Sequence, residues 1–315
     1  MLATVPLAWG TWSVANVAVL DIWATAGALP PPPPLLNAAI QCCSLAALTA
    51  VCVCASSRRP TQLRSFAEKA MVARGGLELG GLLFVGSTLQ LYALQLSTAS
   101  RVAFIVQTTT VLVPLLESAI KGGSVAGRTW AACFMAMAGI AVLSFGDGAA
   151  AAVLPAAHAT GDCLALVAAV FFACHVVRLE RFARRCAPLR LAWAKAAVQA
   201  FLTLALTAVA SAAGAIAPAS ALEGLMRAGP TPVAAVVALL VWNGVVPSAY
   251  TVFAQSYAQA RVSPAEANLW YSAQPVAAAA LAALFLGEQL GTNGLVGGAL
   301  IVGACVFGGG GEVSR

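Results

Sequence analysis

AACFMAMAGIAVLSF, residues 131–145, is an uninterrupted apolar stretch, and VAAAALAALFL at 276–286 is a second one. Neither stretch alternates apolar with polar residues, as the strands of a membrane barrel do. Helices and closed barrels are the spanning structures that satisfy every backbone polar group inside a bilayer. The two stretches therefore predict membrane-spanning α-helices.

The whole chain has the composition of a membrane protein. Of its 315 residues, 61% are hydrophobic and only 9% are charged, and its mean hydropathy is +0.88. Soluble domains carry roughly 25% charged residues, so this chain lacks the polar material for a water-facing surface. Its formal net charge of +6 is attributed to loops on one side of a membrane, and no nucleic-acid site is inferred from it.

Ten apolar segments have about the length of a bilayer crossing, which is roughly 17–25 residues. They fall at 2–20, 35–55, 75–96, 100–120, 129–145, 161–177, 191–216, 233–256, 265–286 and 292–307. Pro114, Pro247 and Pro275 lie inside these segments and are candidates for hinges or for static kinks, because a proline frees a carbonyl and bends a helix. Residues 30–34 predict a stiff extended connector, and 146–160 a linker between halves. The predicted fold class is all-α, an integral membrane protein of ten transmembrane helices.

The basic residues gather on one side of this topology. The loops after the second, fourth, sixth and eighth segments, with the C-terminus, hold 14 of the 17 Lys and Arg residues. Two of these loops, 58–74 and 178–190, are strongly basic. Cytoplasmic loops carry such an excess, so both termini are expected on the cytoplasmic or equivalent side. Plasma membrane and plastid envelope stay open as locations, and so does a homodimer.

The second half of the chain repeats the first at a constant shift. This shift aligns Gln90, Tyr92 and Ala93 with Gln255, Tyr257 and Ala258. Each copy contains five segments, an odd number, so the second copy enters the bilayer from the opposite side. Secondary transporters use such inverted repeats to alternate access to a central site. The predicted domains are two five-helix repeats, at 6–146 and 161–307.

A series of short motifs runs in order along nearly the whole chain. They are Trp9-Gly10-Thr11, Thr98-Ala99-Ser100-Arg101-Val102-Ala103-Phe104, Gly161-Asp162, Ser263-Pro264-Ala265 and Leu286-Gly287-Glu288-Gln289-Leu290. In this order the chain resembles the EamA-type members of the drug/metabolite transporter (DMT) superfamily. The resemblance implies two EamA-like domains and the transport of small metabolites. Family members often have an arginine where this chain has Gln41, so no substrate is inferred from the resemblance. They also have a glutamate where this chain has Gly123, a difference that is interpreted as structural.

Polar side chains inside the predicted spans are the candidates for a solute-binding cavity. A buried polar group in a bilayer is costly unless it has a partner or lines a wet path. The candidates are Trp9, Trp12, Asn16, Gln90, Gln107, His175, Asn243, Tyr250, Asn268 and Tyr271. Hydrogen bonding between helices is the alternative role for these groups. Lys195, in the seventh segment, is expected to extend its ammonium to the membrane surface.

Neither a cofactor nor a metal site is predicted. The nine cysteines lack the paired spacing of a zinc site or a disulfide framework. No phosphate-binding loop occurs, so an ATP-driven pump is not expected. The predicted function is transport of small metabolites by alternating access, with the lipid bilayer and a small-molecule substrate as partners. The alternatives are a non-transporting scaffold or receptor and, more weakly, a membrane-embedded enzyme, for which HExxH and GxSxG motifs are lacking.

Overall fold

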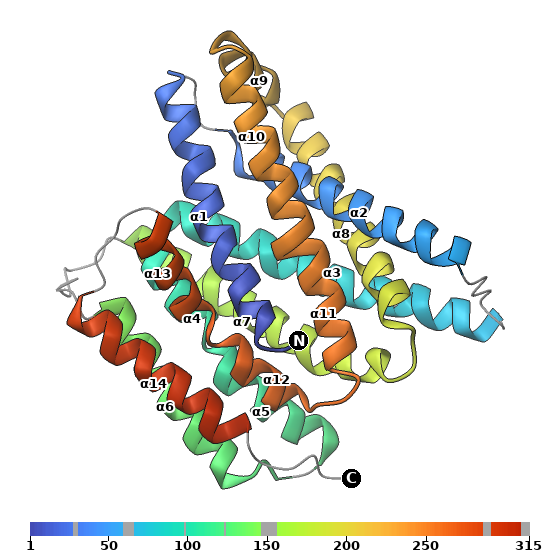
Figure 1. Cartoon of the computed structure of the whole chain (residues 1–315), viewed down its shortest axis with the longest axis vertical. Helices are drawn as coiled ribbons and strands as arrows, with labels where there is room; N and C mark the ends of the chain where they lie inside the picture. Colours follow the sequence, from blue (N-terminus) through green and yellow to red (C-terminus); the bar gives the residue numbers. More distant parts are fainter. Residues whose placement is uncertain are drawn as a thin grey trace. The chain divides into compact units, whose positions relative to one another are not determined.

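The computed structural model describes residues 1–27, 31–58, 66–97, 99–122, 124–145, 156–285 and 291–309. These residues form helices and short connections, and no strand occurs among them. Figure 1 labels the helices from α1 to α14. One π-helical segment, η1, lies between α10 and α11. The predicted all-α class is confirmed.

Seven helices in the described part of the chain are long and apolar enough to cross a membrane. They cover Thr4–Thr25, Pro33–Ala55, Phe66–Leu96, Val102–Lys121, Ala159–Ala183, Pro188–Ala212 and Pro230–Ala258. Two shorter apolar helices, Gly127–Val142 and Thr292–Gly308, add to these. Each of the nine overlaps a segment that the hydropathy pattern predicts as a span.

The chain forms two compact units, and each combines segments from both halves of the sequence. Unit 1 comprises Met1–Gly10, Leu82–Arg185 and Gln255–Arg315, and unit 2 comprises Thr11–Gly81 and Cys186–Ala254. Helices α1 (Thr4–Thr25) and α3 (Phe66–Leu96) therefore contribute to both units. The two repeats at 6–146 and 161–307 stay a prediction.

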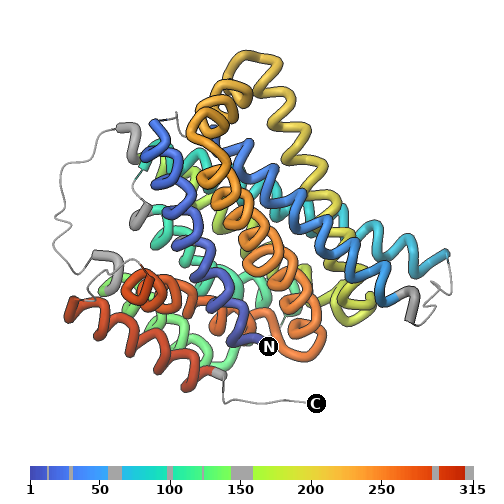
Figure 2. The backbone as a smooth tube through the Cα atoms, turned by 45° about the horizontal axis from the view of Figure 1, so that its top comes forward, coloured from blue at the N-terminus to red at the C-terminus, as the bar shows by residue number. Residues whose placement is uncertain are grey.

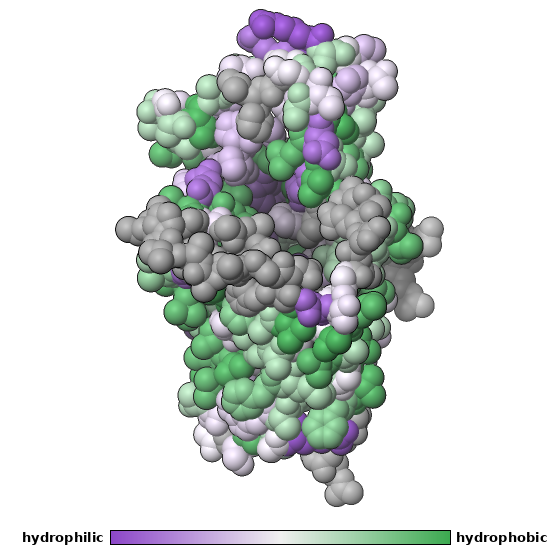
Figure 3. Space-filling view, turned by 90° about the vertical axis from the view of Figure 1, so that its left-hand side faces the viewer, coloured by the Kyte–Doolittle hydropathy of each residue, from purple (hydrophilic) through white to green (hydrophobic). Residues whose placement is uncertain are grey.

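In unit 1, α6 (Gly127–Phe145) and α14 (Thr292–Gly309) pack side by side along their length (Figure 1, Figure 2). Glycine permits this close approach, because a Cβ on Gly139 would lie only 2.7 Å from the carbonyl oxygen of Gly297. Hydrophobic residues cover most of the lower part of Figure 3, the region where α6 and α14 lie in Figure 1. Such a surface is suited to contact with lipid.

Two spans of unit 1 are interrupted, each at the same place in its half of the sequence. Their bounds are Ala99–Val106 for α4, Thr109–Lys121 for α5, Pro264–Tyr271 for α12 and Gln274–Phe285 for α13. The gaps hold Gln107 and Thr108 in the first span, and Ser272 and Ala273 in the second.

The starts of these helices follow the sequence repeat. The shift that takes Gln90 to Gln255 also takes the first residue of α4 to the first residue of α12. The same shift takes the start of α5 to the start of α13, and the start of α6 to the start of α14. The repeat in the sequence is thus accompanied by a repeat in the positions of the helices.

The second interruption corrects the prediction of one continuous helix over 265–286. The Ser272 hydroxyl donates to the Leu269 carbonyl (2.6 Å), and the Ala273 N–H donates to the Trp270 carbonyl (3.2 Å). These bonds tighten the chain locally to 3₁₀ geometry. Pro275 is therefore the second residue of α13 rather than an interior one, and its missing N–H removes no helical bond there.

In unit 2, α2 packs against α8 and η1, and α9 packs against α10. The bounds are Pro33–Arg58 for α2, Pro188–Ala212 for α8, Pro218–Arg227 for α9, Pro230–Asn243 for α10, Gly244–Tyr250 for η1 and Thr251–Ala258 for α11. Two hydrogen bonds join α2 and α8: Trp193 Nε1 donates to Thr49 Oγ1 (2.9 Å), and the Thr207 hydroxyl donates to the Pro34 carbonyl (3.1 Å). Residue numbers run in opposite directions across these bonds, so the two helices are antiparallel.

Pro247 lies inside η1, the π-helical segment that continues α10. A proline has no N–H to complete the α-helical ladder, and π-helical turns are one way in which a helix accommodates this loss. The Thr251 hydroxyl donates to the Pro247 carbonyl at 2.6 Å. The predicted position of Pro247 within a span is confirmed, and the helix is locally widened there.

Several segments predicted as loops are helical instead. The basic segment 58–74 is helical from Phe66 onward, so its last basic residues belong to α3. The first basic residues of 178–190 belong to α7 (Ala156–Ala183). Pro33 of the predicted connector opens α2, because proline is well suited to the first turn of a helix. Most of the predicted linker, 146–155, and the motif at 286–290 lie outside the described residues.

Candidate solute-binding region

Trp9 of α1 and Tyr271 of α12 meet in unit 1. Their ring centroids are 5.3 Å apart at an interplanar angle of 67°, the edge-to-face arrangement that aromatic pairs favour. The neighbouring Gly10 lets α1 approach α13 closely, since a Cβ there would lie 2.9 Å from the Ala277 backbone. The structure thus brings together two of the residues predicted to line a cavity.

Asn268 lies one turn before Tyr271 on α12, and both side chains are buried. Within the described part of the chain, neither Asn268 Nδ2 nor the Tyr271 hydroxyl has a hydrogen-bond partner. Buried polar groups are nearly always paired, and leaving one unpaired costs about 1–3 kcal/mol. Both groups are therefore suited to hydrogen-bond a bound molecule.

The first interruption, between α4 and α5, also carries polar groups. Gln107 is half-buried in the gap itself. The Thr108 hydroxyl donates to the Ile105 carbonyl (2.6 Å), whereas the buried Thr110 hydroxyl has no partner among the described residues. Because α12 packs against α5, the two interrupted spans are neighbours within unit 1.

Gln90 and His175 are the remaining predicted site residues of unit 1. Gln90 is half-buried on α3, and His175 is buried on α7. Next to His175, the Val176 carbonyl accepts a hydrogen bond from Gln259 Nε2 (3.2 Å), while Gln259 Oε1 lacks a partner in the described residues. Sequence reasoning missed Gln259, although it closely follows the repeated Tyr257.

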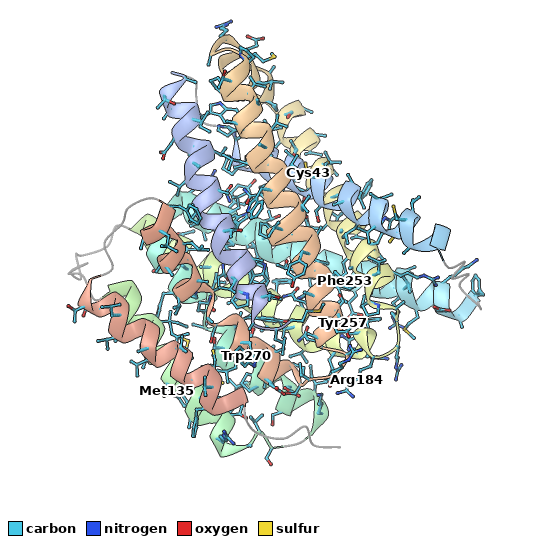
Figure 4. All side chains as sticks on the ribbon, viewed as in Figure 1. Cys43, Met135, Arg184, Phe253, Tyr257 and Trp270 are labelled. Carbon is cyan, nitrogen blue, oxygen red and sulfur yellow. The ribbon has the colours of Figure 1, made fainter. Side chains whose placement is uncertain are left out.

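A network of charges joins three helices of unit 1 at the start of α12. Glu117 forms an ion pair with Lys121 one turn along α5 (2.7 Å), and its second oxygen accepts the Ala265 N–H near the start of α12 (3.0 Å). Lys121 also pairs with Glu180 of α7 (2.6 Å), which in turn pairs with Arg184 (2.9 Å), labelled in Figure 4. A carboxylate is stabilised by the free N–H groups at a helix start. The network therefore holds the ends of α5, α7 and α12 together.

The other four predicted site residues belong to unit 2. Trp12 is exposed, and Asn16 Nδ2 donates to the Trp12 carbonyl (2.8 Å), so the Asn16 amide bonds within its own helix. Tyr250 ends η1 and is half-buried. Asn243 is wholly buried at the end of α10. The structure describes no contact that would gather these four residues into one cluster.

Lys195 contradicts the expectation that its ammonium extends to the membrane surface, because its side chain is 0% exposed. Helix α3 covers this side of α8. A Cβ on Gly80 would lie 2.7 Å from the Lys195 carbonyl oxygen, and one on Gly76 would lie 2.6 Å from the Ala194 Cβ. The signal present in the sequence is Gly76-x-x-x-Gly80, a spacing that permits close helix contact in membranes.

The second half of the chain has a recognisable family. A family model, described as the EamA-like transporter family, matches residues 159–308. This half of the chain is similar to the members of that family. The predicted resemblance to EamA-type DMT transporters is confirmed. Together with its apolar helices, the match makes the protein an integral, multi-pass membrane protein.

Solved structures extend the fold likeness from the EamA-like region to the whole chain. One crystal structure, described only as that of a protein, matches with a TM-score of 0.71 at 22% sequence identity. The match covers 97% of this chain and 94% of that chain. At this identity the likeness shows the fold alone. In total, 29 chains of solved structures match, and no curated protein does.

The EamA-like region contains half of the predicted site residues. They are His175, Asn243, Tyr250, Asn268 and Tyr271. The interrupted span α12/α13 also lies wholly inside the matched range, whereas its counterpart α4/α5 precedes it. One interrupted span therefore lies in the part of the chain that matches the family model, and the other lies in an earlier part.

Proposed function

We propose that this EamA-like protein carries a small polar or amphipathic solute across a bilayer by alternating access. The observation that supports this most strongly is the pair of interrupted spans, α4/α5 and α12/α13, whose helix starts are related by the shift of the sequence repeat. In secondary transporters, discontinuous helices at corresponding positions of the two halves mark the binding site. Here each interruption is one tightened turn, in which the Gln107 N–H still donates to the Ala103 carbonyl (3.1 Å) and the Ser272 N–H to the Asn268 carbonyl (3.0 Å), so we assign solute binding to the side chains beside the interruptions.

The proposal includes ten spans arranged as two inverted repeats. It counts α4 with α5, α12 with α13, and α10 with η1 and α11 as one span each. These three join α1, α2, α3, α6, α7, α8 and α14. Five spans in each half would invert the second half relative to the first. The excess of Lys and Arg in alternate loops would then place both termini on the cytoplasmic or equivalent side.

The proposed binding region lies in unit 1, beside the two interruptions. Gln107 lies in the first interruption and Thr110 follows it, whereas Asn268 and Tyr271 precede the second. Trp9 packs against one side of the Tyr271 ring. Amide and hydroxyl groups on an apolar background suit a solute that is partly polar and partly apolar. A solute that bonds the unpaired Asn268 amide and Tyr271 hydroxyl would gain about 1 kcal/mol from each bond.

Uptake into liposomes tests the proposal. Purified protein is reconstituted and offered amino acids, nucleosides, organic acids and sugar phosphates, with and without a proton gradient. Saturable uptake of one class is the expected result, and the gradient arm shows whether protons are coupled. Binding of a solute by folded protein without any saturable uptake would contradict a carrier and favour a receptor.

Tyr271→Phe probes the binding region directly. The substitution removes one hydroxyl and keeps the ring against Trp9, so uptake at low solute concentration is expected to fall about fivefold, the equivalent of one hydrogen bond. The matched control is Tyr257→Phe, because the Tyr257 ring is partly exposed and stacks on the Arg261 guanidinium at 3.9 Å. Its loss of a hydroxyl should leave uptake unchanged. Wild-type uptake by Tyr271→Phe would remove this hydroxyl from the region.

A further inference from the structure

Lys195 lies on a membrane-spanning helix of unit 2 without a partner. Its side chain is wholly buried, and its Nζ has no hydrogen-bond partner in the described residues. A charged group in a bilayer interior is costly, and such residues normally pair with an opposite charge or lie on a solute path. An apolar side chain would pack against the neighbours of α8 equally well. Packing alone therefore does not explain a lysine at this position.

Two more buried polar side chains of unit 2 lack partners. Asn243 is wholly buried, and both its Nδ2 and its Oδ1 are without hydrogen bonds to the described residues. Ser44, on α2, is 1% exposed, and its hydroxyl also has no hydrogen-bond partner among the described residues. Helix α2 packs against α8 and against α10 with η1, and each of these three helices contributes one such group.

The contacts between α2 and α8 put Lys195 and Ser44 on neighbouring turns of the two helices. Lys195 directly precedes Ala196, which belongs to a buried apolar cluster with Leu48 of α2 and Ala249 of η1. Ser44 lies one turn before Leu48, and residues four apart share a face of a helix. The face of α2 that packs on Ala196 therefore continues directly into Ser44.

The segment that carries Asn243 packs on the same stretch of α2. It is followed by Gly244, which packs tightly on α2: a Cβ at this position would contact Cys43, labelled in Figure 4, and would lie 3.0 Å from the Ser44 backbone nitrogen. Only a glycine permits this approach. Ser44 is thus the common neighbour of the segments that carry Lys195 and Asn243.

The three groups are rich in donors and carry positive charge. A lysine ammonium has three N–H donors and no acceptor, an asparagine amide has two N–H donors, and a serine hydroxyl has one donor. No Asp or Glu occurs in the sequences of α2, α8, α10 or η1. The helices that carry the three groups therefore supply no balancing charge.

The neighbouring α3 carries two carboxylates, and neither is placed to balance Lys195. Glu68 is held by Arg190 at 3.3 Å. Glu78 lies midway between Gly76 and Gly80, the residues that contact α8, and so falls on the opposite face of α3. The balancing negative charge is therefore assigned to a bound molecule.

We propose that unit 2 holds a binding site for an anionic oxygen group, a carboxylate or a phosphate. Lys195 supplies the charge, and Asn243 and Ser44 supply further hydrogen bonds. Charge-assisted bonds to such oxygens are about twice as strong as neutral ones. The group belongs either to a free anionic solute or to a lipid headgroup, and binding at this site does not depend on transport.

Anion binding by the purified protein tests this site without any transport measurement. Inorganic phosphate and succinate are titrated into wild-type protein in a neutral detergent, at constant ionic strength maintained with chloride, and thermal unfolding is followed by tryptophan fluorescence. A ligand that binds only the folded state stabilises it, so Tm is expected to rise by a few degrees at saturation with at least one anion. No rise with either anion would overturn the proposal.

Lys195→Met is the decisive variant, and Lys69→Met is its matched control. Loss of the buried charge is expected to weaken anion binding by roughly 30-fold or more. Lys69 is an exposed lysine on α3 of the same unit, so the control should respond as the wild type does. An equal anion response in Lys195→Met and wild type would overturn the proposal.

Asn243→Asp provides a second, independent variant. It supplies a carboxylate from the chain itself, so this variant should fold without a bound anion and should no longer respond to phosphate. An undiminished phosphate response would contradict the shared site. Native mass spectrometry separates the two sources. A phospholipid retained by wild type and lost from Lys195→Met identifies a headgroup, whereas a phosphate response without retained lipid identifies a free solute.

Discussion

Lys121 of unit 1 and Lys195 of unit 2 both lie on membrane-spanning helices, yet their surroundings are opposite. Lys121 ends α5 between Glu117 and Glu180, with ion pairs of 2.7 and 2.6 Å. Lys195 is buried about two turns into α8 and has no partner in the described residues. Lys121 therefore joins the ends of helices in unit 1, whereas Lys195 of unit 2 joins nothing among the described residues. A charge of the second kind points to a ligand.

Removal of a joining charge should have the largest effect on stability. Glu117→Gln removes the ion pair with Lys121 and weakens the bond from the Ala265 N–H, so the free energy of unfolding is expected to fall by about 2–3 kcal/mol. Denaturation of the purified protein, followed by circular dichroism, measures this loss.

The control for Glu117→Gln is an ion pair that has the same spacing along its helix but is exposed to solvent. Glu223 pairs with Arg227, also one turn further along its helix, but the two side chains are 58% and 81% exposed. Solvent screens such a pair, so Glu223→Gln should change the free energy of unfolding by no more than about 0.5 kcal/mol. Equal losses in both variants would refute a special role for the buried network.

Removal of the solitary charge should act in the opposite direction. In the absence of added anion, Lys195→Met replaces a buried ammonium by an apolar chain of similar length. The free energy of unfolding is therefore expected to rise by about 2 kcal/mol. Lys121→Met, by contrast, should lower it. A destabilised Lys195→Met would show that the ammonium stabilises the fold and would remove the contrast between the two lysines.

The smallest expected effect concerns the helix contact that covers Lys195. Gly80→Ala would set a methyl group 2.7 Å from the Lys195 carbonyl oxygen and 2.8 Å from the Val198 Cβ. The net loss of stability is expected to be about 1 kcal/mol, because overpacking outweighs the better helix propensity of alanine. Gly81→Ala is the control, since its Cβ would have no neighbour within 4 Å. If Gly80→Ala and Gly81→Ala are equally stable, α3 does not approach α8 as closely as described.

The hydropathy pattern predicts where the spans lie because a bilayer crossing demands a long apolar run. It marks Pro275 as a candidate hinge, but it does not predict that the helix is already interrupted at Ser272, three residues earlier. A hydroxyl-to-carbonyl bond such as that from Ser272 to Leu269 does not by itself mark an interruption, because the Ser87 hydroxyl makes the same kind of bond to the Phe84 carbonyl inside the continuous helix α3. The first interruption, at Gln107, escapes prediction for the same reason.

The candidate site is likewise predictable from the sequence only in part. Trp9, Asn268 and Tyr271 could be selected because an aromatic or amide group inside an apolar run stands out in the sequence. Their contacts depend on which helices pack together, and a pattern along one helix carries no information on that. The burial of Lys195 depends on two glycines from a distant part of the sequence, on α3. Residue type alone favoured the membrane surface for that side chain.

Alternating access is tested most directly by counterflow in liposomes. Vesicles containing the protein are loaded with unlabelled solute, of the class that the uptake panel identifies, and are then diluted into a trace of labelled solute. A carrier that alternates between two openings should accumulate label transiently above its equilibrium level, and Tyr271→Phe should slow this accumulation. Identical uptake of label by loaded and empty vesicles would contradict alternating access.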